Sequence, residues 1–142
     1  MEDIKLASKG AALAAGRDQN RLQIVQKQIT MADYETDSCD SVQETVRRMA
    51  SIPYELIVLD EDMFHEDNRI LIYMVGIPMQ LRRSALYLLS GAAYKSMDTF
   101  SAFVAAVDGL INYQDLGRLS GYIKILKKEH HRLYREFIKI VQ

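Results

Sequence analysis

The sequence has few of the residues that cross-link a fold covalently or through a metal ion. It holds one cysteine, two prolines and no tryptophan among its 142 residues. A lone Cys39 excludes an internal disulfide framework and a four-cysteine metal site. The three histidines, His65, His130 and His131, do not have the spacing of a zinc site. Stability must therefore come from burial of apolar surface, and 49% of the residues are hydrophobic.

Neither sign of charge dominates, and no long apolar run is present. Lys and Arg number 18 against 19 Asp and Glu, a net charge of −1 that does not suit a polyanion binder. No run reaches the roughly 18 apolar residues of a membrane span, and the N-terminal segment has no signal-peptide pattern. We expect a single cytoplasmic domain over residues 1–142, with neither a nucleic-acid nor a membrane partner.

Short apolar runs alternate with longer amphipathic segments along the chain. We expect strands at 11–15, 34–36, 56–59, 85–89 and 110–111, and helices that start after Asp18 or Asn20, after Ser41, near 70, after Ser96 and near 116. Strict alternation favours a parallel sheet with helices on both faces. The sequence therefore predicts an α/β fold with a doubly wound five-stranded parallel sheet of order 2-1-3-4-5, flavodoxin-like or CheY-like, over residues 10–120.

Two helix boundaries carry further local signals. Ser41 and Glu44 have the spacing of a capping box, in which the hydroxyl and the carboxylate each bind a free backbone amide. Ser96 is expected to cap a helix whose apolar face begins at Met97, and Gly109 is expected to end that helix.

The last helix, expected over 116–141, is longer than such a sheet needs. One side of this helix carries residues at alternating spacings of four and three, all apolar except His130: Leu119, Ile123, Leu126, His130, Leu133, Phe137 and Ile140. This spacing is a heptad seam, and about 25 residues of helix span about 37 Å. We expect Leu126, Leu133, Phe137 and Ile140 to form an interaction face, with the C-terminal end overhanging the domain and pairing with a second copy. The alternative is that this end folds back on its own domain.

An apolar strand that ends in Asp60 gives the chain a family resemblance. Residues 54–63 resemble the third strand and phosphoacceptor turn of response-regulator receiver domains, with Phe64 where proline is usual. The strand that ends at Ser90 is similar to the fourth receiver strand. The resemblance covers about residues 10–120 in element order. It implies that Asp60 stands at the phosphoacceptor position and Ser90 at the switch hydroxyl.

Other members of the receiver site are missing. Phosphoryl transfer to an aspartate needs Mg²⁺, which the family holds with an acidic pair after the first strand. Gly16 and Arg17 stand at those positions, and neither side chain can ligate a cation. Asn112 replaces the family's lysine at the end of the fifth strand, and Tyr113 follows it where proline is usual. The resemblance therefore implies a degenerate receiver, or pseudo-receiver, that needs no cofactor.

The pocket beside Asp60 allows three interpretations. In the first, the Arg17 guanidinium pairs with Asp60 and takes the place of the cation. In the second, Asp60 is a working phosphoacceptor, with Mg²⁺ held by Asp18, Asp60 and Asp62. In the third, the crevice at the strand ends binds a small molecule.

The function that we expect is protein interaction in bacterial two-component signalling. The sequence has no Gly-rich phosphate loop, nucleophile elbow or HExxH motif, so we expect no enzyme. The resemblance implies a protein partner that contacts the fourth helix, the fifth strand and the last helix. Met97, Phe103, Tyr113 and Gln114 are candidates for that face.

Overall fold

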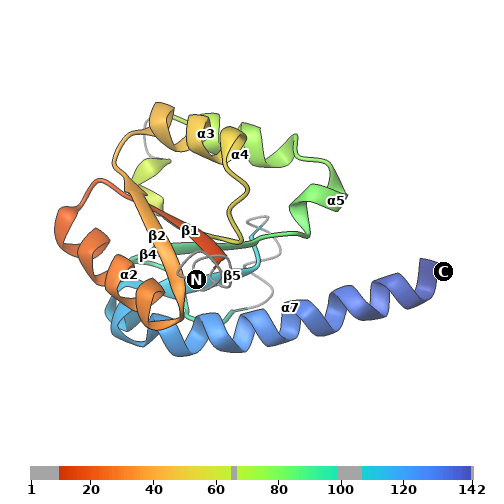
Figure 1. The fold of residues 1–142 in the computed structure, drawn as a ribbon. Helices are drawn as coiled ribbons and strands as arrows, with labels where there is room; N and C mark the ends of the chain where they lie inside the picture. The colour runs from red at the N-terminus through yellow and green to blue at the C-terminus, as the bar shows by residue number, and fades with distance from the viewer. Residues whose placement is uncertain (1–9, 65–66, 99–106, 142) are drawn as a thin grey trace, which may run out of the picture.

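The computed structural model describes residues 10–64, 67–98 and 107–141, with the side chains of 79, 80 and 131–141 excepted. The described strands form one parallel sheet of order β2-β1-β3-β4-β5, which confirms the predicted fold class and strand order. The strands are β1 (Gly10–Ala15), β2 (Tyr34–Cys39), β3 (Leu56–Asp60), β4 (Leu86–Gly91) and β5 (Gly109–Asn112) (Figure 1).

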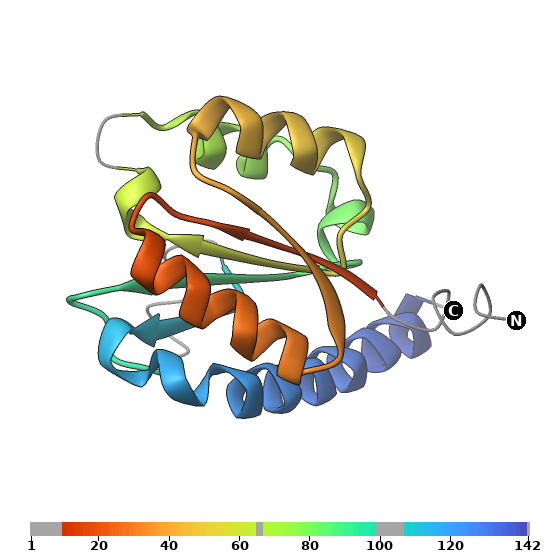
Figure 2. The ribbon, with the colours of Figure 1, turned by 60° about the vertical axis from the view of Figure 1, so that its left-hand side comes forward.

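Helices cover both faces of the sheet, as Figure 2 shows. One layer holds α2 (Gln19–Met31) and α7 (Leu119–Val141); the other holds α3 (Val42–Ser51), α4 (Arg69–Val75) and α5 (Met79–Arg82). Every residue of β3 and β4 is buried, because helices lie on both sides of these central strands. The strand β2 is longer than expected. It lies at the sheet edge and is mostly polar, so no apolar run in the sequence marks its full length.

The predicted helix caps are confirmed only in part. Asp18, rather than Asn20, caps α2, since its Oδ1 accepts the amide of Arg21 at 3.0 Å. The Ser41 hydroxyl accepts the amide of Glu44 at 3.2 Å, which is one half of the expected capping box. The other half is absent from the described contacts of Glu44, whose carboxylate pairs instead with two arginines one turn further along α3.

In the segment between β4 and β5, Ser96 does not cap a helix that begins at Met97, as we had expected. Ser96 donates to the Asp115 carboxylate at 2.6 Å and accepts the amide of Asn112 at 2.8 Å, so its hydroxyl ties this segment to the end of β5. Met97 has a φ of 65°, which is not helical. Most of the helix expected here, with Phe103, lies outside the described residues, and Gly109 begins β5.

The last helix starts three residues later than expected. A 3₁₀ helix, η2 (Tyr113–Arg118), precedes α7. The first turns of α7 bury Leu119 and Ile123 against the sheet, and the Gln28 side chain of α2 accepts the amide of Ser120 at 2.9 Å. These contacts fasten the start of α7 to α2 and the sheet.

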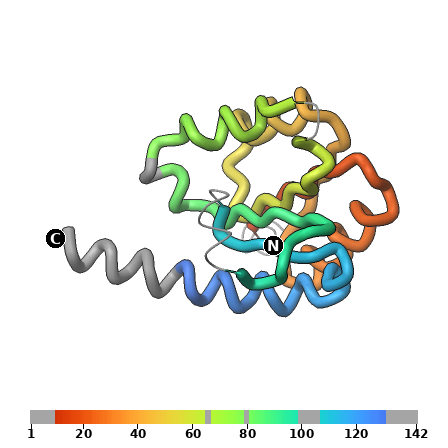
Figure 3. Tube along the Cα trace, turned by 180° about the vertical axis from the view of Figure 1, so that it is seen from behind, coloured from red at the N-terminus to blue at the C-terminus, as the bar shows by residue number. Residues whose placement is uncertain are grey.

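The C-terminal turns of α7 extend beyond the sheet (Figure 1), as expected from the length of the helix. Seen from behind in Figure 3, the earlier turns of α7, in blue, run along the lower side of the domain. The side chains of Leu133, Phe137 and Ile140 lie outside the described residues, whereas Leu126 packs against the core of its own domain. His130 is not solvated as a surface histidine would be, because its Nε2 lies 2.5 Å from the Arg83 carbonyl. No helix within the described residues is long and apolar enough to cross a membrane.

Candidate functional site

The candidate site lies at the carboxyl ends of β1 and β3. Asp60 is the last residue of β3 and is only 6% exposed. Its Oδ1 accepts the amide of Asp62 at 3.0 Å and caps the short 3₁₀ helix η1 (Glu61–Met63). An aspartate that follows a buried strand often binds the backbone two residues further on in this way. The turn therefore holds the Asp60 carboxylate at the sheet edge, under the start of α2.

Arg21, in the first turn of α2, holds three carboxylates together. Its Nε donates to Asp60 Oδ2 at 2.8 Å, and its two terminal nitrogens lie 3.3 Å from Asp18 Oδ2 and 3.2 Å from Asp62 Oδ2. The helix cap at Asp18 puts Arg21 one turn further on, facing the end of β3. A guanidinium suits this position because its planar fork of donors is always charged. We call Asp18, Arg21, Asp60, Asp62 and Tyr113 the Asp60 cluster.

Tyr113 completes the hydrogen bonds of Asp60. Its hydroxyl donates to Asp60 Oδ1, and its ring lies 3.9 Å from the Arg21 guanidinium carbon in a cation–π contact. Burial, and then the hydrogen bond to Asp60, raise the pKa of Tyr113 well above its usual value, so the hydroxyl keeps its proton at neutral pH. Burial alone would lower the pKa of Arg21, but the hydrogen bond and charge of Asp60 help to outweigh it, and the net shift is upward.

Asp62 joins the cluster to the loop between β1 and α2. Its carboxylate accepts the backbone amides of Arg17 at 3.1 Å and Asp18 at 3.3 Å. Burial and the neighbouring Asp60 charge raise the pKa of Asp62, while the two amides and Arg21 act in the opposite direction. Three carboxylates thus share one guanidinium, and the backbone amides and the Tyr113 hydroxyl offset part of the remaining negative charge. The Asp18 side chain is 40% exposed, so water screens its charge.

The Asp60 cluster as arranged does not fit a magnesium ion. Mg²⁺ requires near-octahedral oxygen ligands, but Arg21 occupies the point on which Asp18, Asp60 and Asp62 converge. Both oxygens of Asp60 already accept hydrogen bonds. No group of three or more acidic, histidine or cysteine side chains among the described residues is placed to hold a metal. The three predicted ligands are close together, but they bind a guanidinium.

The hypothesis that Arg17 pairs with Asp60 is wrong, because a different arginine makes the pair. Arg21 makes that pair, whereas Arg17 is exposed and gives its backbone amide to Asp62. At Gly16 an added Cβ would lie 3.0 Å from the Cβ of Asp60, so the main chain there runs close against the aspartate. The signal for Arg21 was its position three residues after a capping aspartate, which places it in the first helical turn beside the strand ends.

Ser90 lies beside Asp60 on the neighbouring strand. It is buried, and its hydroxyl donates to the Leu59 carbonyl at 3.4 Å. A cavity of about 10 Å³ lies between Gly16, Arg21, Asp60 and Ser90. That volume holds one water at most. This cavity between the described residues is therefore too small for a small-molecule ligand while Arg21 stays in place.

Asn112, which we expected at the position of the receiver lysine, does not contact Asp60 among its described hydrogen bonds. Its amide nitrogen donates to the carbonyls of Ala92 at 3.0 Å and Tyr94 at 2.8 Å, and its oxygen caps η2 by accepting the amide of Gln114 at 2.9 Å. The next residue, Tyr113, reaches Asp60 instead. Sequence reasoning assigned Tyr113 to a partner surface and so missed its place in the cluster.

Solved structures share this fold at low sequence identity. The chemotaxis response regulator CheY4 of Vibrio cholerae matches with a TM-score of 0.58 and 15% identity, over 84% of this chain and 98% of that one. The receiver domain of the Francisella response regulator 1452 matches at 0.66 and 16%, over 85% and 98%. An orphan response regulator of H. pylori matches at 0.61 and 18%, over 83% and 98%. No family model matches the sequence, and no curated protein does.

Proposed function

We propose that this chain, which has the fold of response-regulator receiver domains, is a pseudo-receiver. By this we mean a non-enzymatic protein-interaction module of a bacterial two-component-type pathway, placed in the cytoplasm. The proposed module works without Mg²⁺-dependent phosphorylation of Asp60. Its architecture presents surfaces to partner proteins, and its pocket is held closed by its own side chains.

One observation carries this proposal: the Arg21 guanidinium occupies the point where the three carboxylates converge. Phosphoryl transfer to Asp60 would need an exposed oxygen and a metal that offsets the charge of the incoming group. Here Asp60 is 6% exposed and both of its oxygens accept hydrogen bonds. Arg21 and Tyr113 would both have to leave before the aspartate could act as a nucleophile.

The decisive experiment is incubation of the full chain with acetyl phosphate and Mg²⁺, followed by intact-mass measurement. We expect no phosphoryl adduct on the wild type, and no saturable NMR shifts around Asp60 when Mg²⁺ alone is added. An adduct that disappears in Asp60→Asn would establish the alternative, an atypical phosphoacceptor. Beryllofluoride bound at Asp60 would contradict the proposal in the same way.

The second part of the proposal is a homodimer through the C-terminal turns of α7. It is supported by the heptad spacing of Leu133, Phe137 and Ile140 and by the extension of α7 beyond the sheet. Solution mass tests it with the full chain: we expect a dimer for the wild type and a monomer for Phe137→Glu. Lys128→Glu, at an exposed position earlier on the same helix, is the control and should remain dimeric. A monomeric wild type would remove this part only.

A further inference from the structure

The layer formed by α2 and α7 carries a concentration of positive charge. Besides Arg21 of the Asp60 cluster, residues 19–31 and 116–128 contain five cations and no aspartate or glutamate. All five are exposed: Lys27, Arg118, Lys124, Lys127 and Lys128. The net charge of the whole chain is −1. Positive charge is therefore gathered on one side of a chain that is nearly neutral as a whole.

No carboxylate of the described residues neutralises these five cations. None of them forms an ion pair with another described residue, and Lys127 instead lies 5.2 Å from the centre of the Tyr34 ring. Asp115, just before this part of α7, accepts the Ser96 hydroxyl. Asp33, just after α2, is exposed and pairs with none of the five. Their positive charge is thus available to a partner.

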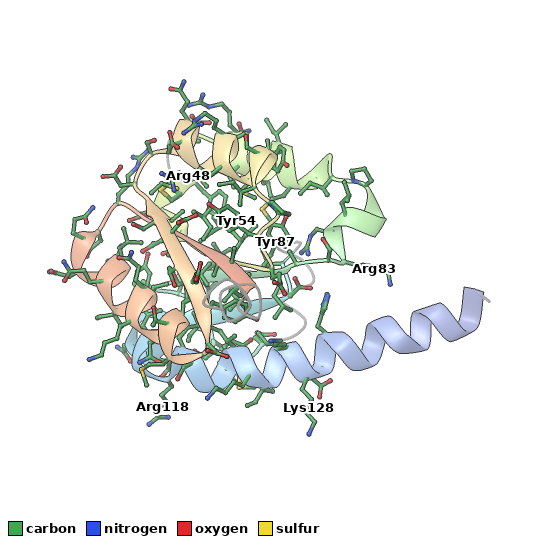
Figure 4. The ribbon with its side chains drawn as sticks, viewed as in Figure 1. Arg48, Tyr54, Arg83, Tyr87, Arg118 and Lys128 are labelled. Carbon is green, nitrogen blue, oxygen red and sulfur yellow. The ribbon has the colours of Figure 1, made fainter. Side chains whose placement is uncertain are left out.

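The five cations lie on the outer side of two helices that are packed together. The Gln28 side chain of α2 accepts the amide of Ser120, and Figure 2 shows α2 and α7 side by side. In Figure 4 the labelled side chains of Arg118 and Lys128 both point away from the sheet. Glu129 faces another side of α7, where it lines a hollow together with Met97 and Asp108 among others.

Two exposed aliphatic side chains of α2 lie among these cations. Ile24 and Met31 are 44% and 56% exposed, and Lys27 stands one turn from each of them. Spacings of three and four place the three side chains on the same side of the helix. We call the exposed side chains of this surface the α2–α7 face: Ile24, Lys27, Met31, Arg118, Lys124, Lys127 and Lys128. It combines a small apolar centre with a rim of one charge sign.

We propose that the α2–α7 face docks an acidic surface of a partner protein, with Ile24 and Met31 at the centre of the contact. This inference rests on the proposed function as an interaction module and names the charge of the partner. Cations without a partner in their own chain attract a surface of opposite sign and repel one of the same sign. A second copy does not fit, because it would bring five cations against five.

Two other anionic occupants match the α2–α7 face less well. A helix that binds a membrane surface inserts a large apolar side into the lipid, whereas α2 and α7 bury theirs against the sheet through Leu22, Ile29, Leu119 and Ile123. Single-stranded nucleic acids stack on aromatic side chains. The only aromatic residue in 19–31 and 116–128 is Tyr122, which is buried. An apolar centre inside a polar rim is typical of protein interfaces.

The first experiment titrates the isotope-labelled full chain with three synthetic helical peptides. All three carry two leucines on one side, and the flanking positions are all Glu, all Gln or all Lys. At about 150 mM salt we expect saturable NMR shifts in α2 and the first turns of α7 with the Glu peptide. The Gln peptide should bind about tenfold more weakly, and the Lys peptide should not bind. Added salt should weaken the Glu peptide, because exposed charges are screened.

Matched charge reversals assign the binding to this surface. Lys27→Glu and Lys124→Glu should each weaken the Glu peptide about tenfold, since attraction becomes repulsion. Lys95→Glu makes the same change in charge at an exposed position between β4 and β5, and it should leave the affinity unchanged. All three positions are exposed, so the variants should fold, which thermal melting checks.

A second pair of variants tests the apolar centre. Ile24→Ser should weaken the Glu peptide about threefold, because it removes apolar area from the contact. Val75→Ser makes a similar change at an exposed aliphatic side chain of α4, which covers the opposite side of the sheet, and should have no effect on the affinity.

Three results would overturn the docking proposal. They are the absence of saturable shifts with the Glu peptide, an equal loss in Lys27→Glu and Lys95→Glu, and tighter binding of oligothymidylate or phosphatidylglycerol vesicles than of the Glu peptide. The last result would assign the face to a nucleic acid or to a membrane surface. Phosphorylation of Asp60 is a separate outcome: it would remove the pseudo-receiver function while leaving the peptide titration intact.

Discussion

The Asp60 cluster and the outer side of α4 and α5 differ in polarity and in exposure. The cluster is polar and closed, because its carboxylates bind Arg21, Tyr113 and backbone amides of the same chain. The outer side of α4 and α5 is apolar and exposed to solvent, since Ile72, Val75 and Leu81 are each more than 60% exposed. The difference teaches that a polar site that is recognisable from sequence can be closed by its own chain while an apolar surface elsewhere stays exposed. Here the Asp60 motif supports the structure.

The strongest way to break this contrast is to remove the internal cation. Arg21→Met leaves three carboxylates without their shared partner, so we expect a loss of about 2–4 kcal/mol in the free energy of unfolding. The value lies toward the lower end for a buried pair because the Arg21 side chain is 26% exposed. Urea denaturation measures it. Mg²⁺ should raise the melting temperature of this variant and not of the wild type. A loss as small as that of Arg118→Met, an exposed control, would contradict the closed cluster.

Removing the Tyr113 hydroxyl should have the next largest effect. Tyr113→Phe keeps the ring on Arg21 but deletes a hydrogen bond to a carboxylate, worth about 1.5–3 kcal/mol. The pKa of Tyr113 is raised in the folded state, so the folded protein keeps a proton that the unfolded chain loses above about pH 10. The contribution is therefore complete below that pH and declines as the pH rises further.

Denaturation of the wild type and of Tyr113→Phe at several alkaline pH values tests this sign. The gap between the two free energies of unfolding should narrow above about pH 10. Tyr54→Phe serves as a comparison, since burial and the Asp37 carboxylate raise the pKa of Tyr54 to about 12. A gap that widens with pH would mean that Tyr113 is not the donor.

A smaller effect is expected where the main chain runs against Asp60. Gly16→Ala would place a Cβ 3.0 Å from the Asp60 Cβ, so the aspartate must shift by a few tenths of an ångström. We expect a cost of about 1 kcal/mol in the free energy of unfolding. Gly117→Ala is the control, because an added Cβ there meets nothing within 4 Å. Equal values for the two variants would show that the cluster tolerates more movement than its contacts suggest.

The smallest change in the free energy of unfolding is expected for a substitution on the exposed outer side of α4. Val75→Ser changes a side chain that is 72% exposed, so the free energy of unfolding should change by about 0.5 kcal/mol at most. Ile70→Ala on the inner side of the same helix should cost about 2–5 kcal/mol, because Ile70 is fully buried. A large loss from Val75→Ser would mean that the outer side of α4 packs within its own chain.

The sequence predicted the strands and helices that have a clear apolar pattern or a clear boundary residue. The central strands were visible because β3 and the start of β4 are apolar runs. Alternation then favoured a doubly wound parallel sheet, for which the observed order is common at this length. The strand β2 was underestimated because its residues are mostly polar and its pairing with β1 is made by the backbone. Backbone pairing at an edge leaves no pattern of side chains to read.

The sequence predicted the central residue of the candidate site, Asp60, but not the side chains that bind it. Asp60 could be located because a strand end identifies one residue. The partner of Asp60 depends on which turn of α2 faces the strand ends, and on a tyrosine 53 residues away whose direction follows from the η2 turn. Such distances across the fold are set by packing, which one sequence does not display.

A single buried side-chain amide joins the long C-terminal helix to α2. Gln28, near the end of α2, is 8% exposed and accepts the backbone amide of Ser120, 92 residues further along the chain. Arg21 anchors the opposite end of α2 at Asp60. The helix α2 is therefore held near both of its ends by side-chain contacts to segments far apart in the chain. Moving the start of α7 away from α2 would break the hydrogen bond between Gln28 and Ser120.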